Sequence, residues 1–254
     1  MFHVEQNASC DAEHPDTSTI IPIFNVPRGT EFKMKDGVVS PETERAVSGL
    51  IEDGLAELSI SNAGEASLKL TRLVVLVSEW AGRISLTGHR DPLELAGRLV
   101  LDAVALSLAI PELNQASNLA DLGSGIGFPG LPIAILHPKL DVHLVESRLK
   151  RHHLQRELRR QLNLTRVNPI LGRSDDVETR ISDIVVAQAM TNPGEALKLM
   201  RAWARPGGLV ALPASDSANS LDLCQGYSDL ELREYRVPGS GRIRRMWIAR
   251  VERP

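Results

Sequence analysis

Asp121-Leu122-Gly123-Ser124-Gly125-Ile126-Gly127-Phe128-Pro129-Gly130 is the stretch that decides the fold of this 254-residue chain. An apolar run ends at its acidic first residue, four glycines follow, and Leu131 to His137 then has the pattern of a helix. Glycines at alternate positions allow positive φ and let a ligand approach the backbone without meeting a Cβ atom. The order of strand, tight loop and helix is typical of a nucleoside-binding loop at the carboxyl edge of a parallel sheet.

Two cofactor classes compete for this loop. Gly125-x-Gly127-x-x-Gly130 also satisfies the dinucleotide fingerprint, and that pattern alone is weak. Asp121 separates the two, because a carboxylate beside the first glycine suits the cationic amino-acid end of S-adenosylmethionine and would repel an anionic pyrophosphate. We therefore expect S-adenosylmethionine as the cofactor, with a dinucleotide and a purely structural turn as the alternatives.

A second acidic residue favours a nucleoside ligand. Glu146 closes the next apolar run, Leu140 to Val145, about 20 residues beyond the glycine loop, where a carboxylate commonly accepts hydrogen bonds from ribose hydroxyls. Both acids end consecutive strands, so they are expected to flank one crevice. Asp121 is then placed toward the methionine end of the cofactor and Glu146 toward the ribose.

The chain divides into three parts by pattern. Residues 1–40 mix Pro, Asp, Thr, Ser and Gly without periodicity and predict a mobile N-terminal extension. Residues 41–112 carry apolar side chains at helical spacing and predict a helical cap. Residues 113–254 alternate short apolar runs with helical stretches, which predicts a doubly wound, Rossmann-like α/β sheet.

The elements of the sheet domain can be given bounds. Strands are predicted at Asn118–Leu122, Leu140–Glu146, Val167–Leu171, Ile184–Gln188 and Leu209–Pro213, and helices at 130–137, 148–162 and 194–204. Arg205-Pro206-Gly207-Gly208 is predicted as the turn before the fifth strand. Strands near 230–237 and 243–251, joined through Pro238-Gly239-Ser240-Gly241, predict a terminal antiparallel hairpin, which is typical of class I S-adenosylmethionine-dependent methyltransferases.

Composition excludes several classes of protein. The formal charge of −3 does not mark the whole chain as a nucleic-acid binder, and 43% hydrophobic residues are enough for a globular core. Cys10 and Cys224 lie far apart and outside any metal-ligand spacing, so neither a disulfide framework nor a metal site is expected. The polar N-terminus and the absence of a long apolar run predict a soluble cytoplasmic protein without a membrane partner, and we expect a monomer.

Four stretches of the chain resemble one family, the bacterial small-subunit ribosomal RNA guanine-N7 methyltransferases that include glucose-inhibited division protein B. They are Ile84–Pro92, Arg98–Ala103, Asp121–Pro132 and Glu146–Arg151, and the resemblance covers roughly residues 65 to 215. The Phe-Pro-Gly-Leu-Pro portion of the third stretch is more specific than a generic glycine loop.

This resemblance implies a cofactor, a substrate and a set of contacts. The cofactor is S-adenosylmethionine, and the acceptor is N7 of a guanine in 16S ribosomal RNA, presented as RNA or as the 30S subunit. The implied cofactor-binding residues are Asp121, Gly123, Ser124, Gly125, Gly127, Phe128, Glu146, Ser174, Asp175 and Gln188. Arg98, Arg148, Arg151 and Arg173 are the cations of this chain that we expect to bind the substrate. Asp175 is expected to take the adenine amino group, although Arg173 to Asp176 also has the pattern of a polar helix cap.

The chemistry requires little of the protein's side chains. Guanine N7 carries an in-plane lone pair, so its methylation needs neither prior deprotonation nor a covalent enzyme nucleophile. The protein has to align the reacting atoms and exclude water. No side chain is therefore assigned a catalytic role.

Two departures from the family pattern bear on the substrate. Gln188 stands where the family has Arg, and Pro213 where it has Lys, so two cations worth about 1 to 3 kcal/mol each are missing. The alternatives are a methyltransferase of another RNA or of a small molecule, and a non-catalytic RNA- or ribosome-binding relative. Cations cluster after Glu146 and near the last hairpin, where they can follow a phosphate backbone or form a solvated face. They are Arg148, Lys150, Arg151, His152, His153, Arg156, Arg159 and Arg160 in the helix, and Arg242, Arg244 and Arg245 near the hairpin.

Overall fold

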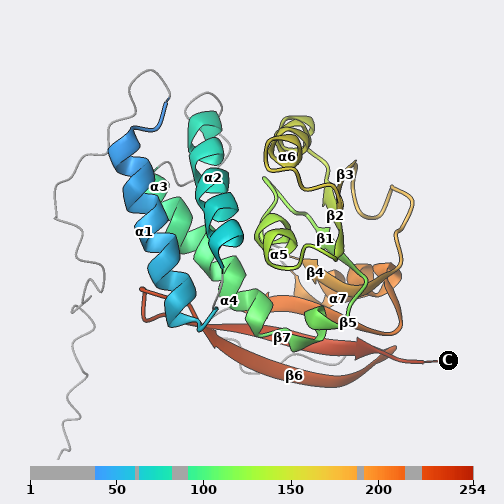
Figure 1. Cartoon of the computed structure of the whole chain (residues 1–254). Helices are drawn as coiled ribbons and strands as arrows, with labels where there is room; N and C mark the ends of the chain where they lie inside the picture. The colour runs from blue at the N-terminus through green and yellow to red at the C-terminus, as the bar shows by residue number, and fades with distance from the viewer. Residues whose placement is uncertain (1–37, 61–62, 82–90, 188–191, 215–224, 254) are drawn as a thin grey trace, which may run out of the picture.

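The computed structural model describes residues 38–60, 63–81, 91–187, 192–214 and 225–253. A seven-stranded sheet in the order β3-β2-β1-β4-β5-β7-β6 forms its centre (Figure 1). The strands are β1 (Asn118–Leu122), β2 (Asp141–Glu146), β3 (Val167–Leu171), β4 (Ser182–Ala187), β5 (Ala204–Ala214), β6 (Tyr227–Arg236) and β7 (Ile243–Val251). β1 to β5 are parallel, and β7 runs antiparallel between β5 and β6. The predicted α/β class and terminal hairpin are confirmed.

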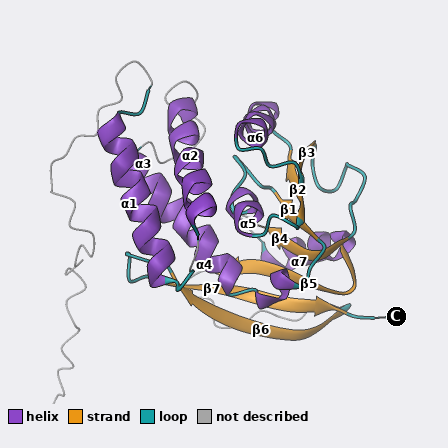
Figure 2. Ribbon diagram, viewed as in Figure 1, coloured by secondary structure: helices purple, strands orange, loops and turns teal. Residues whose placement is uncertain are grey.

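Alternate residues of the strands feed two hydrophobic layers, as the pleat requires. Leu119 joins the layer beneath α5 (Gly130–Leu136) and α6 (Leu149–Gln161), whereas its neighbour Ala120 joins the layer beneath α7 (Pro193–Trp203). Figure 2 shows the helices of the cap and α5 on one side of the strands. Both faces of the sheet are therefore covered, which explains why its central strands read as continuous apolar runs.

The N-terminal helices form the expected cap. They are α1 (Pro41–Glu57), α2 (Gly64–Ala81), α3 (Pro92–Leu95), the π-helix η1 (Ala96–Leu101), α4 (Asp102–Leu108) and the 3-10 helix η2 (Pro111–Asn114). Ser40 begins α1 by accepting the Thr43 N–H through Oγ at 3.2 Å, and Val39 is buried against the core. Val39 and Ser40 therefore belong to the folded region, although the prediction assigned them to the 1–40 extension. Residues 1–37 lie outside the described part of the chain.

The cap and the sheet share one hydrophobic core, which contains side chains from α1, α2, α4 and α5 together with β1, β2 and β4. Ion pairs fasten the cap to the terminal hairpin. Arg233 of β6 makes two hydrogen bonds of 3.0 Å to the Glu112 carboxylate, and Arg244 of β7 reaches Asp102 Oδ2 at 2.9 Å. The cap is thus an integral layer of the fold.

The structure corrects the predicted start of β5. The prediction placed Arg205 to Gly208 in a turn, but Ala204 already pairs with Ser182, and the register shifts before Ile184 pairs with Leu209. The two glycines permit this irregular start: Gly207 has φ of 75°, and a Cβ on Gly208 would lie 2.8 Å from the Arg205 carbonyl oxygen. Turn-forming residues therefore lie inside the strand.

The strand order reverses at β1, which lies between β2 and β4. From β1 the chain builds outward through β2 and β3, then returns to place β4 on the other side. Ligands of open α/β sheets bind at the carboxyl ends of the strands at such a switch point. The glycine-rich segment leaves β1 at this point. None of the described helices is both long enough and apolar enough to cross a bilayer.

Candidate cofactor site

The glycine loop follows β1 and is shaped by backbone conformations that other residues adopt with strain. Gly123, Gly125 and Gly127 have φ of 69°, 59° and 106°. At Gly127 a Cβ atom would also lie 2.3 Å from Cδ1 of Leu131 in α5. The loop can therefore turn tightly onto α5 only because this position has no side chain.

The loop is fastened to β2 and α6 by hydrogen bonds. The Ser124 N–H donates to the Val145 carbonyl at 3.0 Å, and Ser124 Oγ donates to the same oxygen at 3.2 Å. Gln155 Nε2, from α6, donates to Ser124 Oγ at 2.8 Å and to the Gly125 carbonyl at 2.7 Å. The loop thus has a fixed shape before any ligand arrives.

Gln155 is a positioning residue that the sequence analysis missed. Its side chain is fully buried, on the same face of α6 as Leu154 and Leu158. A signal for it was present, because an amide on the apolar face of a helix needs a buried partner. The partner is the glycine loop, 30 residues away along the chain.

We expect Gln155→Leu to destabilise the protein by about 1–3 kcal/mol, because Ser124 Oγ and the Gly125 carbonyl would lose a buried donor. Urea unfolding measures this change. Gln161→Leu, in the exposed last turn of the same helix, is the matched control and should change the free energy of unfolding by less than about 0.5 kcal/mol. Equal effects of the two substitutions would contradict the assigned role of Gln155.

Asp121 lies beneath the loop and is completely buried. Its Oδ2 accepts the Gly130 N–H at 2.9 Å, at the first residue of α5, while its Oδ1 is buried without a hydrogen-bond partner among the described residues. Burial and, as a smaller cause, the nearby Glu146 raise the pKa of this carboxyl to about 7, although the Gly130 N–H opposes the shift. An acid with one unsatisfied buried oxygen is suited to a cationic or hydrogen-bonding ligand.

Glu146 lies on the neighbouring strand, since Leu122 of β1 pairs with Val145 of β2. Only 4% of its surface is exposed. Its Oε1 accepts the Arg148 N–H at 2.7 Å, and its Oε2 lies 3.8 Å from Arg151 Nη1. The carboxylate is oriented by these contacts and keeps lone pairs that can accept from hydroxyl groups. Asp121 and Glu146 therefore lie at the ends of adjacent strands, as predicted.

The segment after β3 contains the other predicted contacts. Arg173 makes two 3.0 Å hydrogen bonds to the Asp175 carboxylate, so the predicted substrate cation and the predicted adenine acceptor neutralise each other in this structure. Both side chains are exposed. The Ser174 carbonyl accepts from Nε1 of the buried Trp203 at 2.9 Å, which anchors the segment to α7.

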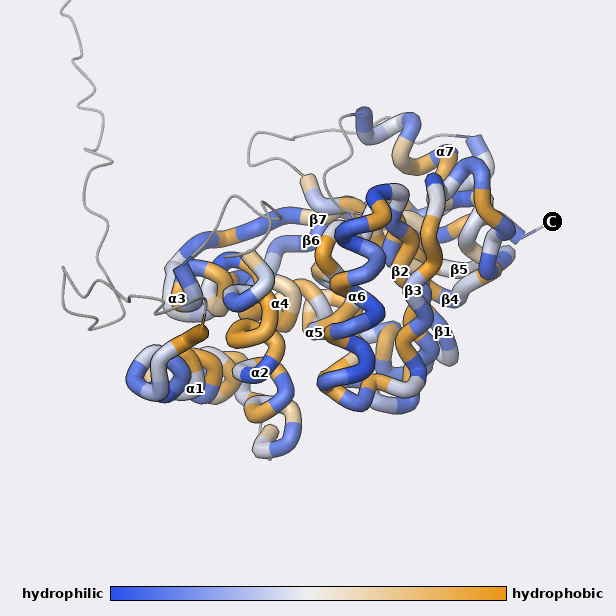
Figure 3. Tube along the Cα trace, turned by 90° about the horizontal axis from the view of Figure 1, so that it is seen from above, coloured by the Kyte–Doolittle hydropathy of each residue, from blue (hydrophilic) through white to orange (hydrophobic). Residues whose placement is uncertain are grey.

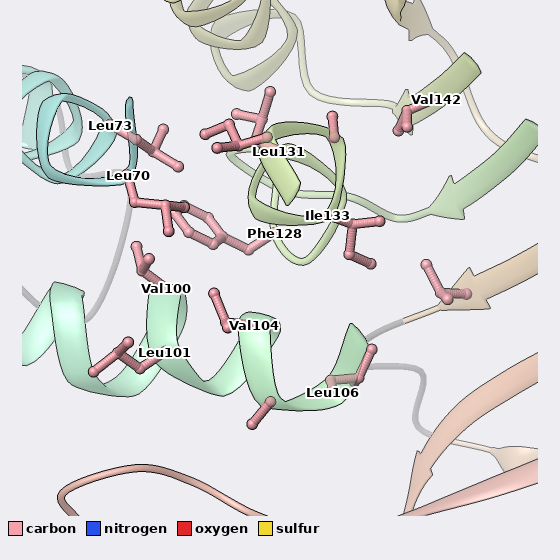
Figure 4. Close-up of a cluster of buried hydrophobic side chains, with 14 of the residues drawn as sticks. Leu70, Leu73, Val100, Leu101, Val104, Leu106, Phe128, Leu131, Ile133 and Val142 are labelled. Atoms are coloured by element: carbon pink, nitrogen blue, oxygen red, sulfur yellow. The ribbon is translucent and has the colours of Figure 1, made fainter. Parts of the chain in front are cut away.

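The remaining predicted site residues lie in the core, on the cap or outside the described part of the chain. The Phe128 side chain is 7% exposed and packs with Leu70, Val100 and Leu131 between the cap and α5 (Figure 4), so its ring belongs to the core. Arg98 lies on η1, half-exposed and 3.9 Å from Glu94. Gln188 lies outside the described residues. Within the described ranges, no group of three or more His, Cys, Asp or Glu side chains is arranged to hold a metal ion.

The site combines buried acids, a buried amide and a glycine loop, and this combination fits a nucleoside-containing ligand. The positive-φ glycines give the close approach such a ligand needs, and the free Oδ1 of Asp121 and the lone pairs of Glu146 supply acceptors. S-adenosylmethionine carries donors for both, in its ammonium group and its ribose hydroxyls. The residues present therefore fit this cofactor.

Comparison with known proteins gives consistent matches. The family model of GidB, described as rRNA small subunit methyltransferase G, matches residues 67–225. A protein of Chromohalobacter salexigens named ribosomal RNA small subunit methyltransferase G is 31% identical over 196 residues, which is 76% of this chain and 92% of that protein. A protein of the same name from Xanthomonas oryzae pv. oryzae is 31% identical over 220 residues, covering 85% of this chain and 99% of its own.

Solved structures match the fold. A putative O-methyltransferase from Klebsiella pneumoniae has a TM-score of 0.56 at 14% identity, over 82% of this chain and 99% of its own. The O-methyltransferase from Bacillus cereus, in complex with SAH, has a TM-score of 0.53 at 13% identity, over 82% of this chain and 100% of its own. At these identities the likeness concerns the arrangement of helices and strands.

Proposed function

The chain belongs to the GidB family, the rRNA small subunit methyltransferases G, and on this basis we propose that it transfers a methyl group from S-adenosylmethionine to RNA of the small ribosomal subunit. The match spans the glycine loop, both strand-end acids and the segment after β3. The observation that carries the proposal is that two buried acids, Asp121 and Glu146, lie at the ends of the neighbouring strands β1 and β2 beside that loop.

The residues of this chain have separable roles in such a reaction. S-adenosylmethionine supplies an electrophilic methyl group on a sulfonium centre. The glycine loop would hold the cofactor close to the backbone, Glu146 would accept hydrogen bonds from the ribose hydroxyls, and Asp121 would attract the ammonium group. The guanine N7 lone pair attacks without prior loss of a proton, so the protein contributes alignment and exclusion of water. The proposed acceptor is N7 of a guanine in 16S ribosomal RNA.

The test is transfer of a labelled methyl group to 30S subunits that lack the modification. We expect label in 16S RNA, and N7-methylguanosine among the nucleosides released by its digestion. Label on another atom of the RNA would support methyltransferase activity and would change only the proposed acceptor atom. Cofactor binding without transfer to any ribosomal RNA would contradict the proposed substrate and favour a repurposed relative, consistent with the half-buried Pro213 at the cation position of the family.

We expect Glu146→Ala to weaken S-adenosylhomocysteine binding by roughly 10- to 100-fold, because hydrogen bonds to a charged acceptor contribute about 1.5–3 kcal/mol. Isothermal titration calorimetry measures the affinity. Glu157→Ala, which removes an acid paired with Arg160 on the same helix, is the control and should leave the affinity unchanged. Unchanged binding by the Glu146 variant would remove Glu146 from the cofactor site.

A further inference from the structure

The exposed side of α6 carries cations that have no ion-pair partner among the described residues. The side chains of Arg148, Lys150, Arg156 and Arg159 are exposed, and no carboxylate among the described residues lies within 4 Å of any of them. Some exposed arginines elsewhere do have partners: Arg45 lies 3.7 Å from Glu42, and Arg180 lies 3.0 Å from Glu178. Glu157, the only acid of α6, is taken up by Arg160 and Gln161.

Two of these cations, Arg148 and Lys150, lie at the end of the helix where the dipole disfavours them. The first turn of α6 contains no acidic residue. Arg156 and Arg159 are three residues apart, a spacing at which like charges repel on a helix surface. A local arrangement that opposes folding is expected where function requires it.

The same helix touches the cofactor loop. Gln155, on its buried face, holds Ser124 and Gly125, and Arg148 at its start donates its N–H to Glu146. Figure 3 shows α6 as a largely hydrophilic helix along the outside of the molecule. The helix is on the order of 20 Å long, which matches several nucleotide steps of an RNA backbone. Its exposed face therefore leads away from the cofactor site.

We propose that this face of α6, defined by Arg148, Arg156 and Arg159, which recur at helical spacing on one side of the helix, binds consecutive phosphates of the substrate RNA and orients it toward the cofactor crevice. The inference rests on the proposed RNA substrate and adds the surface that receives it. Phosphate contacts displace condensed counterions, so binding through this face depends steeply on salt. The face contributes affinity and carries no base-specific information.

The test compares two double variants of equal charge change. Arg156→Gln with Arg159→Gln removes two unpaired cations from α6 while keeping good helix formers. Arg45→Gln with Arg180→Gln removes two paired arginines from other faces. Binding of 30S subunits is measured in a salt series, methylation as kcat and KM, and S-adenosylhomocysteine affinity by calorimetry.

We expect the α6 variant to bind 30S subunits on the order of tenfold more weakly at low salt, with a slope of log K against log salt that is smaller by about 1.4. KM should rise with kcat unchanged, and cofactor affinity should stay at the parent value. The control variant should match the parent. An unchanged salt slope and KM in the α6 variant, or equally weakened 30S binding in the control, would overturn the proposal. Methylation by the parent protein would in that case still support the proposed function. A parent that neither binds nor methylates ribosomal RNA would overturn both.

Discussion

Gly127→Ala is expected to abolish cofactor binding and to destabilise the protein by about 2–6 kcal/mol. Two costs add: a non-glycine residue at φ of 106° is strained by about 1–3 kcal/mol, and overpacking against a buried neighbour costs a similar amount. The neighbour is Leu131, whose Cδ1 would lie 2.3 Å from the new Cβ and whose side chain is fully buried. Urea unfolding and calorimetry with S-adenosylhomocysteine measure the two effects.

Two further variants separate these costs. Gly49→Ala lies within α1, where a Cβ meets nothing within 4 Å, and should stabilise the protein by about 0.5–1 kcal/mol. Leu131→Ala removes the atoms with which the Gly127→Ala side chain collides, so the double variant should be less destabilised than the sum of the single variants. Strict additivity would show that contact with Leu131 is not the cause.

The local pattern predicted the placement of the glycine loop and of the two strand-end acids, because strand ends, glycine loops and capping residues are encoded in short stretches of sequence. Asp121, the positive-φ glycines and Glu146 lie where a strand-loop-helix reading puts them, and the antiparallel hairpin follows from two apolar runs around Pro238 to Gly241. Both features depend on neighbours within a few residues. The parallel pairing of β1 with β2 brings the two acids to adjacent strand ends, and consecutive strands are usually neighbours in such sheets.

Features that depend on distant partners were missed. Gln155 has an ordinary helical pattern, and its role appears only when the fold brings it to a loop 30 residues away. Phe128 looks like a ligand-facing member of the loop, but the cap supplies a hydrophobic layer that takes its ring. In each case the sequence specifies the residue type and tertiary packing decides its partner.

Protein stability is expected to fall as pH rises through the range in which Asp121 ionises. The pKa of this carboxyl is about 7 in the folded protein and 3.8 for an ordinary aspartate, so between these values the folded protein holds a proton that the unfolded chain has lost. Stability from this group is complete below pH 3.8 and is lost progressively up to about pH 7, a change on the order of 4 kcal/mol. Asp121→Asn keeps an acceptor for the Gly130 N–H and removes the titration.

Subtraction of the Asp121→Asn profile isolates this carboxyl from other groups. Burial lowers the pKa of His137, His143 and His152, and these histidines act in the opposite sense, since each destabilises the folded protein as pH falls. Urea unfolding of parent and variant between pH 5 and pH 8 gives the difference. A difference that stays constant across this range would show that the buried carboxyl does not titrate there.

Ionisation of the same carboxyl is expected to favour the cofactor, because the ammonium group of S-adenosylmethionine is attracted by a carboxylate and not by its protonated form. With a pKa of about 7, the ionised fraction rises roughly tenfold between pH 6 and pH 8, so cofactor affinity should rise by up to that factor. Asp121→Asn should bind more weakly at pH 8 and show a flat profile. A variant that keeps the parental rise would place the pH dependence on another group and separate Asp121 from the cofactor's cationic end.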